Sequence, residues 1–117
     1  MNNNKLKVCV IIPARFESSR FPGKPLVKLN KIPMVVRVAQ LSSLAVGKNN
    51  VYVATDDNRI VKEVESAGFK AILTSSSALT GTDRVAEAAM PLNYDIYINV
   101  QGDEPLLDFN DIIKCID

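Results

Sequence analysis

The chain has 117 residues, 47% of them hydrophobic, so it is long enough for one domain with a core and too short for two. Fourteen basic residues against thirteen acidic ones leave a formal net charge of +1, which excludes a general positive field for nucleic acid or an anionic membrane. The two cysteines, Cys9 and Cys115, have no metal-ligand spacing and predict core residues in a reducing compartment. The first apolar run is too short for a signal peptide or a membrane span, so we expect a cytoplasmic protein.

Apolar runs alternate with segments of helical period along the chain, which predicts an α/β fold with a parallel sheet. The first run, 6–12, is apolar on both faces and is typical of a central strand. Glycines at 47 and 68 should end two of the helices. The predicted strands are 6–12, 51–54, 69–73 and 96–100, and the predicted helices follow Pro33, begin at Asp56 or Asp57, begin near Thr82 and cover Phe109 to Ile116.

The last of these helices has no closing signal. Apolar residues recur at helical spacing from Phe109 to Ile116, and no glycine, proline or lysine cluster follows before Asp117. We therefore expect the element, and the domain with it, to continue in a longer protein.

The loop from Pro13 to Pro25 follows the first strand and carries the cations Arg15, Arg20 and Lys24. Strands of a parallel sheet point their carboxyl ends into the ligand crevice, where these charges, the Ser18 hydroxyl and backbone N–H groups would meet phosphate oxygens. A solvated basic loop is the alternative, and charge alone does not decide between the two.

Three further polar groups lie at predicted strand-to-helix junctions, which share one edge of a parallel sheet. In the last group, Asp103 follows an apolar strand and offers the hard oxygen ligand that Mg²⁺ prefers, with Gly102 allowing close approach of the backbone. An ordinary turn explains the same residues. The groups are Thr55-Asp56-Asp57, Gly81-Thr82-Asp83-Arg84 and Gln101-Gly102-Asp103-Glu104-Pro105.

Helix capping is the simpler explanation for the first two groups, because Asp and Thr satisfy free N–H groups at a helix start. Arg84 is different. A cation in a first helical turn opposes the helix dipole, which indicates an anionic or hydrogen-bonding partner. The chain contains no histidine, so histidine-activated nucleophiles and histidine-bound zinc are excluded. Phosphate transfer through positioning and charge neutralisation remains open.

Together the motifs resemble the family of cytidylyltransferases that activate the sugar acid 3-deoxy-manno-octulosonate (Kdo) for lipopolysaccharide synthesis. They occur in the family's order and approximate spacing over nearly the whole chain. The motifs are Ile12-Pro13-Ala14-Arg15, Ser18 with Arg20-Phe21-Pro22-Gly23-Lys24-Pro25-Leu26, Pro33-Met34, Val53-Ala54-Thr55-Asp56-Asp57, Gly81-Thr82-Asp83-Arg84 with Glu87, and Asn99-Val100-Gln101-Gly102-Asp103-Glu104-Pro105.

The resemblance implies a nucleotide-diphospho-sugar transferase fold, a Rossmann-like three-layer sandwich, and attack of Kdo on CTP to give CMP-Kdo and pyrophosphate. It implies that Arg15, Lys24 and Asp103 are catalytic, with Asp103 as the ligand of a Mg²⁺ cofactor. The nucleotide-binding residues that it implies are Ala14, Arg15, Ser18, Lys24, Thr74, Arg84 and Gln101.

The length departs from the family, whose members are longer and form homodimers. Residues 1–117 therefore resemble the CTP-binding N-terminal part of a single domain whose C-terminal half, with most of the sugar-acid pocket and a second metal carboxylate, is absent. In such a fragment the strand 96–100 would be an unpaired edge. Two interpretations follow, an active Kdo cytidylyltransferase or a truncated, inactive nucleotide-binding remnant of that enzyme.

Overall fold

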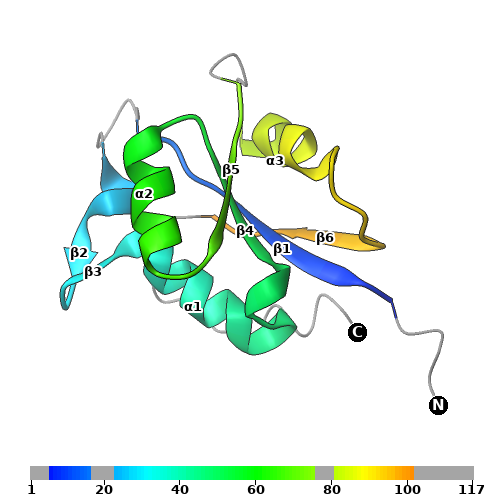
Figure 1. Cartoon of the computed structure of the whole chain (residues 1–117), viewed down its shortest axis with the longest axis horizontal. Coiled ribbons are helices and arrows are strands. Elements are labelled where there is room, and N and C mark those ends of the chain that lie inside the picture. Colours follow the sequence, from blue (N-terminus) through cyan, green and yellow to red (C-terminus); the bar gives the residue numbers. More distant parts are fainter. Residues whose placement is uncertain (1–5, 17–22, 76–80, 102–117) are drawn as a thin grey trace.

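The structure is a computed structural model that describes residues 6–16, 23–75 and 81–101. Its centre is a parallel sheet of four strands in the order β5-β4-β1-β6 (Figure 1). The strands are β1 (Val8–Pro13), β4 (Val51–Thr55), β5 (Lys70–Leu73) and β6 (Ile96–Asn99). The prediction of a parallel sheet with a central first strand is confirmed, because β1 pairs with both β4 and β6.

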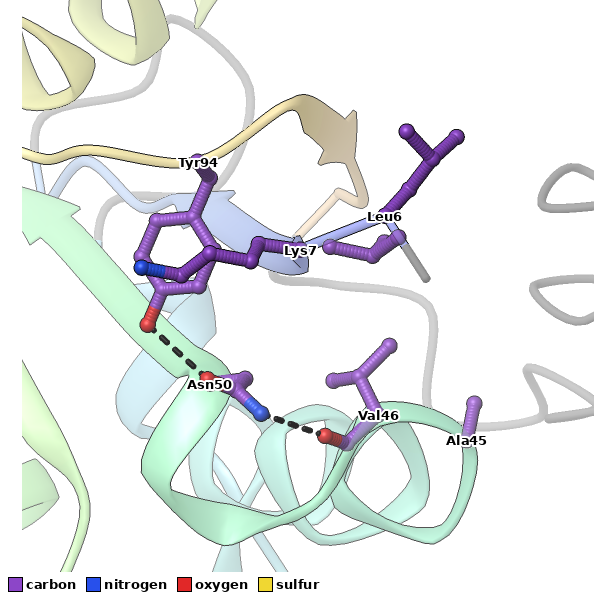
Figure 2. A pocket seen from close by; sticks show the side chains of 7 residues that line it. Leu6, Lys7, Ala45, Val46, Asn50 and Tyr94 are labelled. Carbon is purple, nitrogen blue, oxygen red and sulfur yellow. Dashed lines mark hydrogen bonds between the residues drawn. The ribbon is translucent and has the colours of Figure 1, made fainter. Parts of the chain in front are cut away.

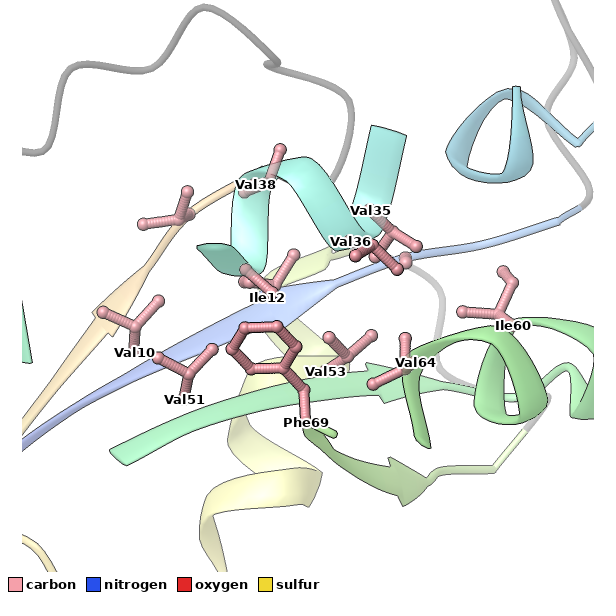
Figure 3. Packing of buried hydrophobic residues seen from close by; sticks show 13 residues of the cluster. Val10, Ile12, Val35, Val36, Val38, Val51, Val53, Ile60, Val64 and Phe69 are labelled. Atoms are coloured by element: carbon pink, nitrogen blue, oxygen red, sulfur yellow. The ribbon is translucent and has the colours of Figure 1, made fainter. Parts of the chain in front are cut away.

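Helices cover both faces of the sheet, which makes three layers. On one face, α1 (Met34–Val46) and α2 (Asn58–Ser66) pack against side chains of β1 and β4, and Figure 3 shows Ile12, Val53 and Val64 in this cluster. On the other face, α3 (Gly81–Ala89) contributes Ala88 to a smaller cluster with Cys9. The predicted three-layer α/β architecture is therefore confirmed for the described residues.

Local signals end and begin the helices as the sequence predicts. Gly47, with φ 90°, is the C-cap of α1, and Gly68, with φ 87°, follows the end of α2. Both adopt a backbone conformation that glycine reaches without steric cost. Asp57 is the N-cap of α2, and its carboxylate accepts a hydrogen bond from the Arg59 N–H. The predicted helix 109–116 lies outside the described residues.

Cys9 is a core residue, as its place in the first strand predicts. It is fully buried in the smaller cluster, and this burial raises the pKa of its thiol to about 11. The thiol is therefore protonated at neutral pH and packs as a small apolar group. Cys115 lies outside the described residues.

A short hairpin between the first strand and α1 does not follow from the sequence signals considered above. It pairs β2 (Lys28–Leu29) antiparallel with β3 (Ile32–Pro33), and follows the 3-10 helix η1 (Lys24–Leu26). Both turn residues, Asn30 and Lys31, have positive φ angles of 53° and 70°. Asn tolerates this conformation, but Lys rarely adopts it. Because Lys31 stands where a glycine is customary, the Asn-Gly signal of a tight hairpin is missing.

A hollow of about 640 Å³ lies at the amino end of the sheet, the edge opposite the predicted site. Figure 2 shows Tyr94 above it, with the tyrosine hydroxyl donating to Asn50 Oδ1 at 2.9 Å and Asn50 Nδ2 donating to the Val46 carbonyl at 2.8 Å. These side chains are joined to one another, and none belongs to the predicted nucleotide site. Within the described ranges, no helix is long and apolar enough to cross a membrane.

Candidate active site

The carboxyl ends of the four strands bring the predicted site residues to one edge of the sheet. The residues that follow β1, β5 and β6 are each held there by a backbone hydrogen bond to the neighbouring strand. Ala14 N–H donates to Ala54 O at 2.9 Å, Thr74 N–H to Thr55 O at 2.8 Å, and Val100 N–H to Ile11 O at 3.2 Å. The edge is therefore fixed by main-chain bonds, independently of any ligand.

The strand order places a topological switch point between β1 and β6. From β1 the chain moves outward through β4 to β5, then returns to pair β6 with the opposite side of β1. Ligands of open α/β sheets bind in the crevice at the carboxyl ends of such a strand pair. Arg15 follows β1, Gln101 follows β6, and both are exposed. The predicted residues nearest the crevice are thus accessible to a ligand.

The two ends of the cationic loop are tied together beside this crevice. Gly23 N–H donates a hydrogen bond of 2.6 Å to the Phe16 carbonyl. Gly23 has φ 77°, and Lys24 follows it as the first residue of η1, where Pro25 is buried. Arg15 directly precedes Phe16, and Lys24 directly follows Gly23. The hydrogen bond between Phe16 and Gly23 therefore brings the backbones of the two cationic residues together.

Arg84 and Thr74 form a second group, on the β5 side of the edge. The Arg84 side chain is 1% exposed, and its Nη1 donates to Thr74 Oγ1 at 2.6 Å. Its Nη2 lies 3.8 Å from Asp56 Oδ2. The partner that the helix dipole argument predicted for Arg84 is therefore present as a carboxylate and a hydroxyl.

This group lies at some distance from the switch point. Thr74 follows β5, which is separated from β1 by β4, so about 10 Å of sheet lies between Thr74 and the end of β1. The Nε atom of Arg84 is buried and has no hydrogen-bond partner among the described residues. Protein encloses the Arg84 guanidinium, which leaves little of its surface for a ligand. Direct contact between Arg84 and a nucleoside therefore stays a prediction.

Two adjacent carboxylates lie between the groups, and each holds an arginine. Asp56 faces Arg84, while Asp57 Oδ2 lies 2.7 Å from Nη2 of Arg59. Hydrogen bonding from the Arg59 side chain holds the pKa of Asp57 below its ordinary value of 3.8. Free carboxylates at this edge would repel a triphosphate, and the two arginines offset that repulsion.

The depressed pKa predicts how acid affects the N-cap of α2. Because the pKa of Asp57 is lower in the folded chain, its contribution to stability is present above the ordinary pKa of 3.8 and is lost as the pH falls from there through the lower pKa of the folded chain. In Asp57→Asn, which retains a capping oxygen, the melting temperature should fall less steeply with pH below 4 than in the unsubstituted chain. Circular dichroism melts at several pH values measure this difference, and parallel curves would contradict it.

Of the predicted site residues, the structure describes Ala14, Arg15, Lys24, Thr74, Arg84 and Gln101, and Ser18 and Asp103 lie outside its ranges. It joins Thr74 to Arg84 and links the positions of Arg15 and Lys24 through one backbone bond. Arg59 was not predicted as a site residue, and its one sequence signal is its place two residues after a capping aspartate. No group of three or more His, Cys, Asp or Glu side chains among the residues described is placed to hold a metal ion.

The sequence profile described as Cytidylyltransferase matches residues 9–117. A curated relative from Shewanella sp. (strain W3-18-1), an 8-amino-3,8-dideoxy-manno-octulosonate cytidylyltransferase, is 52% identical over 106 residues, which are 88% of this chain and 43% of the relative. The chain thus spans less than half the length of this relative.

Solved structures agree with this match. A CMP:2-keto-3-deoxy-manno-octonic acid synthetase complexed with CTP superposes with a TM-score of 0.88 at 42% identity, covering 92% of this chain and 45% of the other. A nucleotidyl transferase from Methanothermobacter thermautotroptrophicus shares the fold, with a TM-score of 0.80 at 12% identity over 94% of this chain and 56% of the other. The nucleotidyltransferase fold predicted from the motifs is confirmed, and the chain belongs to the cytidylyltransferase family.

Proposed function

We propose that residues 1–117 form the CTP-binding part of a cytidylyltransferase that joins CMP to a manno-octulosonate sugar acid and releases pyrophosphate. The observation that carries the proposal is the position of Arg15 and Lys24, which flank the Phe16–Gly23 closure beside the β1/β6 switch point. Two cationic side chains that start from this position suit the triphosphate of a nucleotide.

In this reaction, the anomeric hydroxyl oxygen of the sugar acid attacks the α-phosphorus of CTP and its proton passes to solvent. The bond between the α-phosphorus and the oxygen that bridges it to the β-phosphorus breaks, and pyrophosphate leaves. Negative charge grows on the departing pyrophosphate. Arg15 and Lys24 would stabilise that charge by hydrogen bonding to the phosphate oxygens, and the closure of the loop ends limits the backbone reorganisation needed during the step.

The acceptor is proposed as a class. The curated relative reported above is named for the 8-amino derivative, and the structural neighbour is named for the 2-keto-3-deoxy-manno-octonic acid itself. The sequence motifs favour Kdo, and the name of the relative adds its 8-amino analogue as a second possible acceptor. Both are manno-octulosonates that differ at carbon 8, so an assay should offer each of them.

Magnesium remains a proposal that rests on the sequence. Asp103, the expected ligand, lies outside the described residues, and the described residues offer no cluster of metal ligands. Mg²⁺, when bound, would neutralise phosphate charge. The role assigned above to Arg15 and Lys24 does not depend on it.

CTP binding without turnover is the second candidate for these 117 residues by themselves, because they match 43% of the relative's length. Pyrophosphate release, measured with CTP and either octulosonate at several Mg²⁺ concentrations, separates the two. Turnover by this chain supports the enzyme, and CTP binding without turnover supports the second candidate. Absence of CTP binding under all conditions contradicts both.

Replacing Lys24 by alanine tests the triphosphate assignment directly. A hydrogen bond to a charged group contributes about 1.5–3 kcal/mol, so Lys24→Ala should raise the Kd for CTP about ten- to hundredfold. Lys48→Ala is the matched control. Lys48 also opens a 3-10 helix, η2 (Lys48–Asn50), but η2 precedes β4 and lies at the opposite edge of the sheet. Equal Kd values for the two variants, measured by NMR titration, would contradict the assignment.

A further inference from the structure

Arg59 stacks on the side chain that anchors the cationic loop. Its Cζ atom lies 3.3 Å from the centroid of the Phe16 ring. Arg59 belongs to the first turn of α2, and Phe16 lies beyond the end of β1, so the stack joins two segments that are far apart in sequence. Guanidinium groups are attracted to aromatic faces at such distances.

Asp57 fixes the orientation of this guanidinium. The Arg59 Nε donates to Asp57 Oδ1 at 3.0 Å, and Nη2 donates to Oδ2 at 2.7 Å. A two-point contact of this kind holds the planar group in one orientation. Since the Asp57 carboxylate also caps α2, the guanidinium is tied to the helix start, although the Arg59 side chain is 60% exposed.

Gly23 also lies against the Phe16 ring. A Cβ atom built on Gly23 would lie 3.0 Å from Cε2 of the ring, closer than most Cβ contacts, so a side chain at this position would displace the ring by a few tenths of an ångström. The same two residues share the 2.6 Å backbone hydrogen bond that brings the loop ends together. The ring therefore contacts the guanidinium of Arg59 and the backbone of Gly23, and Lys24 follows directly.

We propose that Arg59 is a positioning residue that fixes Arg15 and Lys24 relative to each other by holding the Phe16 ring against Gly23; this rests on the proposed binding of CTP by these two cations. Arg59 acts through Phe16, and Asp57 neutralises its charge. The competing explanation is that the Arg59 charge attracts the triphosphate directly. The two explanations predict opposite changes in the Kd for CTP when Asp57 is replaced.

The test compares Arg59→Ala, Arg59→Lys and Asp57→Asn with the unsubstituted chain, using CTP titrations followed by NMR. Positioning predicts that Arg59→Ala raises the Kd for CTP about three- to tenfold. It predicts a smaller rise for Arg59→Lys, which keeps a cation over the ring, and a rise for Asp57→Asn. If Arg59 acted directly through its charge, Asp57→Asn would lower the Kd, because the released cation would be free to attract the triphosphate.

Hydrogen exchange of the Gly23 amide gives a readout that needs no nucleotide. Loss of the stack should speed exchange of this amide about three- to tenfold in Arg59→Ala, with the central strand amides unchanged. In a Phe16→Leu background, adding Arg59→Ala should have little further effect on either measurement, because the partner is already gone.

The outcomes separate the two proposals. If the unsubstituted chain fails to bind CTP, the proposed function and the ligand-dependent part of this inference fall together, and the Gly23 exchange still decides whether Arg59 holds the loop ends. If the chain binds CTP and Arg59→Ala binds equally well with unchanged Gly23 exchange, the positioning role is overturned and the proposed function stands.

Discussion

Replacing Arg84 by alanine should lower the free energy of unfolding by about 2–4 kcal/mol, one of the largest losses that a single site-edge substitution can cause in this chain. The side chain is 1% exposed, so its removal leaves a cavity and takes away the donor to Thr74 Oγ1. Asp56, which is 26% exposed, would remain partly solvated without its cation, and this moderates the loss. Urea unfolding followed by circular dichroism measures the change.

Two comparisons identify the source of that loss. Thr74→Val keeps the volume but leaves the buried Arg84 Nη1 short of its 2.6 Å partner, and should cost about 1–3 kcal/mol. Arg59→Ala removes an arginine whose side chain is 60% exposed, and should cost less than about 1 kcal/mol. If Arg84→Ala were no more destabilising than Arg59→Ala, burial would not be the reason for the presence of Arg84.

The strands and helices were predictable because their signals are local. The apolar run at 6–12 predicted β1, and glycines at 47 and 68 predicted the ends of α1 and α2, which the structure confirms to within a few residues. The hairpin β2–β3 was not predicted, because its turn uses Asn30 and Lys31 at positive φ without a glycine. Sequence signals for a turn are weak when the turn contains none of the residue types that favour its backbone conformation, such as glycine for a positive φ.

Contacts between distant segments were only partly predictable. The place of Arg84 in a first helical turn indicated a partner but did not identify it, and the structure supplies Thr74 and Asp56. The stack of Arg59 on Phe16 has no sequence signal at all, since it depends on how α2 packs beside the end of β1. Motifs name the residues of a site, whereas packing decides which of them contact one another.

The Asp56–Asp57 pair illustrates the same limit. The sequence predicts that Asp56 or Asp57 caps the helix, and the structure confirms this with Asp57 as the N-cap. The structure adds that the two carboxylates face different arginines, one toward the Thr74 group and one toward the cationic loop. A short segment at the end of β4 therefore connects both halves of the site edge, and substitutions there should affect each half separately.

The second large effect is expected in the core. Ile12→Ala should lower the free energy of unfolding by about 2–5 kcal/mol, because Ile12 is fully buried between the sheet and its helices and pairs in register with Val53 on the neighbouring strand (Figure 3). Domains have total stabilities of about 5–15 kcal/mol, so this single change would remove a large fraction. Urea unfolding again provides the measurement.

Leu44→Ala is the matched control for Ile12→Ala, since it also removes three carbons but from a side chain that is 63% exposed, and it should change stability by less than about 0.5 kcal/mol.

The two variants also calibrate the binding experiments. A purely destabilised chain binds CTP with an apparent Kd raised only by the inverse of its folded fraction, and a stabilising osmolyte restores it. Lys24→Ala should show the reverse pattern, with unchanged unfolding and a Kd that the osmolyte does not restore. If the osmolyte restored the Kd of Lys24→Ala as it restores that of Ile12→Ala, Lys24 would affect CTP binding through the stability of the fold. That result would contradict the assignment of Lys24 to the triphosphate site.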